Sequence, residues 1–150
     1  MKIRKALIKD LQRIQELNNK LFDLELAKFD SHLIKNWPLS DEGAIYFKNA
    51  ILNSFVIVAE IDNKVVGYLL GEESSIPYYD FKIAELCNMC IDENYRGRGI
   101  GNALYQEFEN YFKERGITRF IVTASFKNEN AKAFYRKMGF EEANSTLTKF

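Results

Sequence analysis

The chain has few of the residues that build metal or disulfide sites. It contains two cysteines and one histidine among 150 residues, too few ligands for a tetrahedral zinc site. Cys87 and Cys90 form a C-x-x-C pair, a spacing that also occurs in redox and zinc motifs. Both fall in an apolar run, 83–91, that reads as a strand, where an odd separation directs the two side chains to opposite faces of the sheet. We therefore predict buried structural cysteines and no bound metal.

Long apolar runs and an excess of charge of one sign are also missing. No run approaches the roughly 20 apolar residues that cross a bilayer, and the N-terminal segment lacks the apolar region of a signal peptide, so we expect a cytoplasmic protein. The 21 basic residues balance the 21 acidic ones, which leaves no broad positive field for a nucleic-acid backbone. Basic and aromatic residues are not interleaved on one element either. Membranes and nucleic acids are therefore disfavoured as partners.

The hydrophobic residues, 47% of the chain, are spaced as in one ordinary globular domain, 1–150. Period-two segments predict strands, and three- and four-residue spacing predicts helices. Strands are expected at 2–6, 55–61, 65–71, 83–91 and 119–124, helices at 7–24, 41–51, 100–112 and 130–137, and an extended terminal segment at 140–150. A strand, a helix and another strand after a run of antiparallel strands require a parallel pair, so the fold class is mixed α/β (α+β).

One loop carries three alternating glycines between an apolar strand and an amphipathic helix. Its sequence is Arg96-Gly97-Arg98-Gly99-Ile100-Gly101. Glycine leaves the backbone open to close approach, and the first turn of a helix offers unpaired N–H groups and partial positive charge. Such a loop suits a phosphate group. Taken alone, it is equally compatible with a tight turn that carries two solvated arginines.

Two common phosphate-binding motifs do not fit this loop. A Walker A loop needs Lys-Ser or Lys-Thr after its last glycine, but Asn102-Ala103 follow Gly101. A dinucleotide-binding loop needs a glycine at position 102 and an acid near the end of the next strand, which here runs through Ile121 to Ala124. Both motifs are therefore excluded.

The chain resembles the GNAT superfamily of acyl-CoA-dependent N-acetyltransferases at two motifs. The first has the form Gln/Arg-x-x-Gly-x-Gly/Ala and the second Asn-x-x-Ala-x-x-x-Tyr-x-x-x-Gly-Phe. The matching residues are Arg96, Gly99 and Gly101, and then Asn128, Ala131, Tyr135, Gly139 and Phe140. The resemblance covers roughly residues 55–140. It implies a central, mostly antiparallel mixed sheet with a splayed parallel strand pair and flanking helices.

The resemblance also implies acetyl-CoA as co-substrate. The glycine loop would hold its pyrophosphate, the end of the preceding strand would pair with its pantetheine arm, and a residue of the last helix would contact that arm from the other side. The implied cofactor-binding residues are Met89, Cys90, Ile91, Arg96, Gly97, Arg98, Gly99, Ile100, Gly101, Asn102, Asn128 and Tyr135.

Two residues correspond to catalytic groups of the family. Glu85 matches the general base that removes a proton from the acceptor amine, and Tyr135 matches the tyrosine that protonates the departing thiolate. Their alternatives are a strand-end glutamate that faces solvent or a lysine, and an ordinary core aromatic. The expected enzyme is an N-acetyltransferase that acts on a small, peptide or protein amine by direct attack in a ternary complex.

The acceptor is less well specified. Several acids near the expected site would favour a cationic amine, and Tyr78 and Tyr79 either line a cleft or cap a loop; the acids are Asp23, Glu25, Asp30, Glu72, Glu73 and Asp80. The ten residues after Phe140 are few for the strand pair that usually closes such a site, so a homodimer is possible. A non-catalytic module that binds CoA or acyl-CoA is the alternative function.

Overall fold

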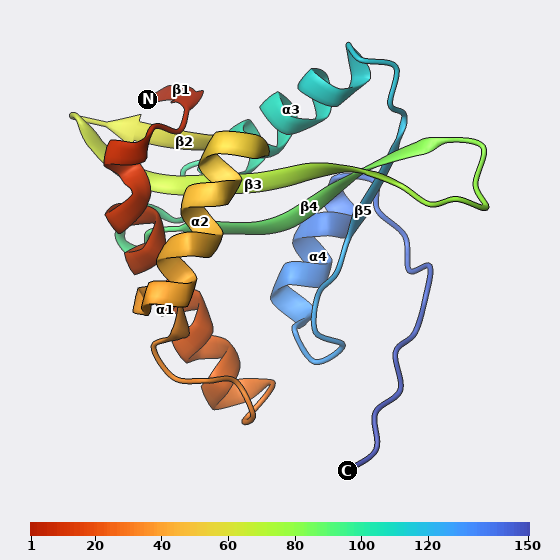
Figure 1. Cartoon of the computed structure of the whole chain (residues 1–150), viewed down its shortest axis with the longest axis horizontal. Coiled ribbons are helices and arrows are strands. Elements are labelled where there is room, and N and C mark those ends of the chain that lie inside the picture. Colours follow the sequence, from red (N-terminus) through yellow and green to blue (C-terminus); the bar gives the residue numbers. More distant parts are fainter.

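The computed structural model describes residues 1–150 and contains one five-stranded sheet whose strands lie in chain order (Figure 1). The strands are β1 (Lys2–Lys5), β2 (Phe55–Ile61), β3 (Lys64–Ser75), β4 (Lys82–Ile91) and β5 (Arg119–Val122). The first four pair in antiparallel fashion, and β4 and β5 pair in parallel. The predicted mixed sheet with one parallel pair is therefore confirmed.

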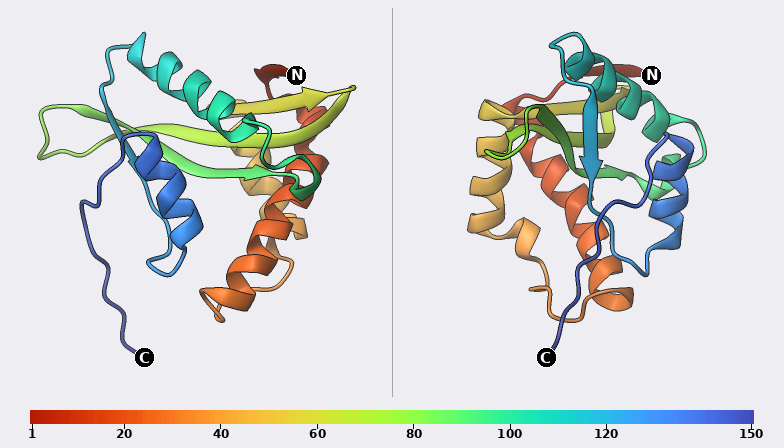
Figure 2. Two further views of the ribbon diagram at one scale, coloured as in Figure 1. Left: turned by 180° about the vertical axis from the view of Figure 1, so that it is seen from behind. Right: turned by 90° about the vertical axis from the view of Figure 1, so that its right-hand side faces the viewer.

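Four helices cover the two faces of the sheet. They are α1 (Leu11–Lys28), α2 (Asp41–Asn53), α3 (Ile100–Lys113) and α4 (Glu129–Lys137). α1 and α2 lie on one face, and α3 and α4 lie on the other, as the edge-on view in Figure 2 shows. Each face therefore has its own hydrophobic core.

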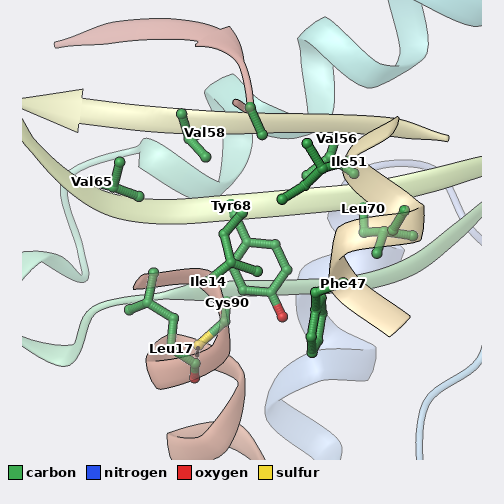
Figure 3. Close-up of a cluster of buried hydrophobic side chains, with 12 residues drawn as sticks. Ile14, Leu17, Phe47, Ile51, Val56, Val58, Val65, Tyr68, Leu70 and Cys90 are labelled. Atoms are coloured by element: carbon green, nitrogen blue, oxygen red, sulfur yellow. Dashed lines mark hydrogen bonds between the residues drawn. The ribbon is translucent and has the colours of Figure 1, made fainter. Parts of the chain in front are cut away.

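The core under α1 and α2 joins apolar side chains of both helices to those of β2 and β3 (Figure 3). At its centre the fully buried Tyr68 packs edge-on against Phe47 of α2. The Tyr68 hydroxyl accepts a hydrogen bond of 2.7 Å from the amide nitrogen of Asn18 on α1. The opposite core gathers the apolar side of α3, with Phe108 at its centre, and the partly buried Tyr135 of α4 packs against it.

Some element boundaries differ from the prediction. The first helix begins at Leu11 rather than Leu7, because a 3-10 turn, Ile8–Asp10, precedes it and the Asp10 carboxylate accepts the Leu7 N–H at 2.8 Å. β3 runs on to Ser75 because its pairing with β4 continues to the last residue. β5 stops at Val122, and residues 141–150 form no strand.

The expectation that Cys87 and Cys90 point to opposite faces is wrong. The β3–β4 register pairs Leu70 with Asn88 and Gly71 with Leu86, which leaves Cys87 as the extra residue of a bulge. The bulge resets the alternation, and both cysteines pack against the core under α1 and α2. Cys90 is buried, with its thiol 3.2 Å from the Leu17 carbonyl, whereas Cys87 is half-buried.

Candidate active site

β4 and β5 separate halfway along β4. Residues 83–86 of β4 pair with residues 119–122 of β5, whereas from Asn88 to Ile91 the strand is paired with β3 alone. Within the stretch from Met89 to Ile91, alternate residues therefore direct backbone groups to the edge that faces away from β3, where no strand pairs with them. Such an edge can accept an extended ligand as an additional strand.

The glycine loop lies directly beyond this open edge. Gly97 and Gly99 have φ values of +75° and +77°, and Gly99 is the N-cap of α3. A β-carbon added at either residue would meet no atom within 4 Å. Glycine is therefore needed here for the left-handed backbone conformation, and both residues face open space. Gly101 lies in the first turn of α3, where a β-carbon would meet the Phe134 ring at 3.5 Å. The loop and the helix start thus expose their N–H groups without side-chain cover.

The two arginines of the loop are exposed and only loosely held. Arg96 donates from Nε to the Ile91 carbonyl at 3.3 Å. The Arg98 guanidinium lies 5.0 Å from the centre of the Tyr95 ring and donates to the Asn94 carbonyl at 3.4 Å. Both can therefore turn toward an anion at the loop at little cost.

A buried ion pair anchors the start of this loop to α1, and the sequence analysis missed it. Asp92 is 3% exposed, and its carboxylate lies 2.5 Å from the guanidinium of Arg13. Burial raises the pKa of Asp92, but the Asn94 N–H and Arg13 outweigh it and hold the pKa below its usual range. No local pattern in the sequence links positions 13 and 92, because only the packing of α1 on β4 brings them together.

α4 lines the other side of the open edge. Tyr135 packs against Phe134 and Phe140, and burial raises its pKa to about 12. Its hydroxyl takes part in no hydrogen bond within the protein and is free for a ligand. Asn128 caps α4 by accepting the Ala131 N–H at 3.1 Å, which leaves its amide NH₂ available as a donor.

On the opposite face of β4, two glutamates stand directly across from each other. Glu72 of β3 is the register partner of Glu85 of β4. Two like charges opposite each other destabilise a sheet, so this arrangement has a structural cost with no structural return. The pKa of the neighbouring Cys87 thiol is raised to about 12, mainly by burial and then by the charges of these two carboxylates.

A pocket of about 280 Å³ opens on the same face, between α1, α2 and β4. The bulge of β4 contributes Cys87 and Asn88 to its wall, and α2 contributes Tyr46 and Phe47. Burial, followed by the charges of Cys87, Glu72 and Glu85, raises the pKa of Tyr46. The glutamate pair therefore adjoins the pocket.

Of the predicted acids, only Glu25 lines the pocket, and Glu72 lies beside it. Asp23, Asp30 and Asp80 are exposed outside it, and Glu73 pairs with Lys82 at 3.0 Å. Tyr78 and Tyr79 lie in the exposed β3–β4 loop, far along the hairpin from the helices in Figure 1, and do not line the pocket. The pocket residues of α2 and of the bulge were missed, because sequence spacing does not reveal a bulge.

The mixed sheet with its splayed strand pair and the glycine loop define a class of protein, that of the acetyltransferase fold. The sequence profile of the Acetyltransferase (GNAT) family matches residues 12–140. The chain belongs to this family and is an acetyltransferase, as the resemblance in its motifs predicted. The family uses acetyl-CoA.

Individual relatives agree with this assignment. The chain is 31% identical over 143 residues to the uncharacterized N-acetyltransferase MJ1530 of Methanocaldococcus jannaschii, covering 95% of this chain and 79% of the relative. The crystal structure of a tetramutant of BH1408 from Bacillus halodurans has a TM-score of 0.90 at 22% identity, with 99% of both chains covered. A predicted acetyltransferase from Clostridium acetobutylicum, solved with acetyl-CoA, has a TM-score of 0.76 at 22% identity, with 99% and 95% covered. These two structures share the fold.

None of the helices combines the length and the apolar character that crossing a bilayer requires. No group of three or more histidine, cysteine, aspartate or glutamate residues is arranged to hold a metal ion.

Proposed function

We propose that the protein transfers the acetyl group of acetyl-CoA to a primary amine by direct attack, with Glu85 as general base and Tyr135 as hydrogen-bond donor to the departing thiolate. The observation that carries this proposal is the position of the open β4 edge. It begins at the bulge, with Glu85 and the pocket on one face of the sheet and Tyr135 packed on the other.

The residues around the open edge fit acetyl-CoA as co-substrate. The N–H groups of residues 97–102 and the charges of Arg96 and Arg98 would hold the pyrophosphate, since the glycine positions leave room for close approach. The backbone of Met89, Cys90 and Ile91 would pair with the pantetheine arm, and the free NH₂ of Asn128 would donate to it from α4. The side chains of Cys90 and Ile100 are buried in the two cores, so these residues would contribute backbone groups only. When bound, acetyl-CoA supplies an acetyl thioester whose carbonyl carbon the amine attacks.

A general base is needed because the acceptor amine is protonated at neutral pH. An alkyl ammonium with a pKa near 10.4 is neutral only about once in 2,500 at pH 7, a deficit of roughly 4–5 kcal/mol. The half-buried Glu85 carboxylate would take the proton of the amine nitrogen, directly or through one water, as the new C–N bond forms. Glu72, the register partner of Glu85 on the neighbouring strand β3, adds negative charge that favours a cationic amine beside Glu85.

Tyr135 acts on the leaving group. With a pKa of about 12, its hydroxyl keeps its proton across the physiological range. A departing thiolate has a pKa near 8.5, so complete proton transfer from Tyr135 is uphill. We therefore expect Tyr135 to donate a hydrogen bond to the sulfur as negative charge develops there, and the final proton to arrive from solvent.

The cysteines argue for direct transfer rather than an acyl-cysteine route. The pKa of Cys87, which lines the pocket, is raised to about 12 by burial and then by Glu72 and Glu85, and burial raises that of Cys90 to about 11. The thiolate is the nucleophilic form of cysteine, and both groups are thiols at neutral pH. Neither is activated for attack.

Release of free CoA thiol from acetyl-CoA, measured with a panel of primary amines, tests this proposal. We expect amine-dependent release to fall about a hundredfold or more in Glu85→Gln and about ten- to a hundredfold in Tyr135→Phe. Tyr78→Phe serves as the control, because Tyr78 is 81% exposed in the β3–β4 loop. Acetyl-CoA binding without turnover on any amine would favour the non-catalytic binding module instead.

A further inference from the structure

The wall of the pocket contains hydrogen-bond acceptors and one carboxylate, Glu25, but no lysine or arginine. Asn18 of α1 is 4% exposed and lines the pocket. Its amide nitrogen is used in the bond to Tyr68, and its oxygen accepts no hydrogen bond within the protein. The side-chain oxygen of Asn88 is fully buried and also has no partner. A buried acceptor without a donor, such as the Asn88 oxygen, is costly, so this wall calls for a ligand that donates hydrogen bonds.

The acceptors are separated by an apolar stretch. Four residues on one face of α1 line the pocket. In order along the helix they are a polar residue, two apolar residues and an acid: Asn18, Leu21, Phe22 and Glu25. Asn18 lies at the end of the pocket next to the sheet, beside Tyr68. Glu25 lies two turns further along the helix. The pocket is therefore polar at both ends and apolar in between.

The two negative regions are distinct. The charges of Glu72 and Glu85 act on Tyr46 and Cys87 at the sheet end. The pKa of Glu25 is raised by burial and then by Asp30, which lies beyond the pocket. Glu25 forms no ion pair within the protein, and a half-buried carboxylate without a partner favours an arriving cation. Two separate sites for positive charge result.

We propose that the acceptor is a short alkane diamine, whose reacting amine lies at the sheet end beside Glu85 and whose second ammonium is bound by Glu25. Asn18 and Glu25, seven residues apart on α1, are separated by about 10 Å, and two hydrogen bonds of about 2.9 Å each leave room for a chain of about two or three methylene groups. Leu21, Phe22 and Phe47 would pack against those methylenes. This inference rests on the proposed acetyl transfer and names its substrate class.

Three matched amines test the proposal: propan-1-amine, 3-aminopropan-1-ol and 1,3-diaminopropane share a reacting end and differ only in the group that would meet Glu25. We expect kcat/KM for the diamine to exceed that for the other two by about tenfold or more, mostly through KM, since a hydrogen bond between charged groups is stronger than a neutral one. Glu25→Gln keeps the side-chain shape and is expected to lower kcat/KM for the diamine by about ten- to a hundredfold, and kcat/KM for propan-1-amine by far less, so that the preference for the diamine is lost. Glu107→Gln, at an exposed position on α3 across the sheet, is the control and should change neither.

Calorimetric titration of each amine into the protein with CoA separates the two levels of the proposal. Equal kcat/KM for the three amines, unchanged in Glu25→Gln, would overturn the diamine inference and leave the acetyl transfer standing. Diamine binding that depends on Glu25 without turnover would support the pocket's specificity and refute the transfer. If the diamine neither binds nor reacts, the inference is refuted.

Discussion

The glycine loop permits a test in which backbone strain and ligand contact can be separated. Gly99 at the start of α3 and Gly116 just after its end have nearly the same φ, +77° and +80°. A β-carbon at either position would meet no protein atom within 4 Å. Alanine at either site therefore costs backbone strain alone, about 1–2 kcal/mol for a left-handed residue.

The two sites differ only in what approaches them. Gly99 is the N-cap of α3, where the pyrophosphate of acetyl-CoA is proposed to bind, and a methyl group there would occupy the open space above the loop. Loss of one or two charge-assisted hydrogen bonds weakens binding by about 1.5–3 kcal/mol each, so Gly99→Ala should raise the Kd for CoA by at least about tenfold. Gly116→Ala should leave that Kd unchanged.

Urea unfolding and calorimetric titration of CoA measure the two quantities. Both variants should lose about 1–2 kcal/mol of unfolding free energy, or roughly 2–8 °C in Tm for a chain of this size. Only Gly99→Ala should lose affinity. Equal CoA affinity in the two variants, with equal losses of stability, would refute the phosphate site at this loop.

Three further predictions concern single contacts. Asp10→Asn should lower the unfolding free energy at pH 7 by about 2–4 kcal/mol, because Asp10 is 5% exposed and makes two hydrogen bonds with Arg4. Burial raises the pKa of Asp10, but Arg4 and the Leu7 N–H outweigh it and hold the pKa below its usual range. The stabilisation is therefore present above the ordinary pKa of an aspartate and lost as pH falls through the lowered pKa, so the stability difference between the two proteins in urea melts should shrink as the solution is made more acidic. Cys87→Ser should keep acetyl transfer within about threefold, since a thiol with a raised pKa is not the nucleophile, and a loss of all turnover would point to an acyl-cysteine route. Gly71→Ala should destabilise the protein by about 1–3 kcal/mol, because the new β-carbon would meet the Phe108 ring at 2.5 Å; Gly71→Ala with Phe108→Leu should recover part of the loss in thermal melts.

The sequence predicted the architecture well because local signals agreed with the final packing. The turn at Asp62 and Asn63 is an example: both residues adopt positive φ, 50° and 61°, as a tight hairpin between β2 and β3 requires. The glycine loop was equally readable, since glycine is the residue type that adopts a left-handed backbone freely and leaves the space above it open. What could not be read were contacts between distant elements, such as Arg13 with Asp92, for which neither partner carries a local signature.

The cysteine error has the same origin. Strict alternation is the correct expectation for a strand, and one extra residue overturns it for every position that follows. Nothing around Cys87 marks the bulge in the sequence, because the bulge is a property of the pairing between β3 and β4. The pocket residues Cys87 and Asn88 were therefore hidden for the same reason.

That single bulge links the main features of the site. It turns Asn88 toward α1 and α2, on the face that Cys87 already occupies, whereas strict alternation would have sent Asn88 to the other face. It also falls where the pairing between β4 and β5 ends, so the open edge and the acceptor pocket meet at one point of the strand. A donor on the edge and an amine in the pocket would then approach the same short stretch of backbone from two sides. An insertion or deletion of one residue at Cys87 should therefore abolish transfer far more completely than any substitution there, while a chain that still folds would keep its glycine loop and its binding of CoA.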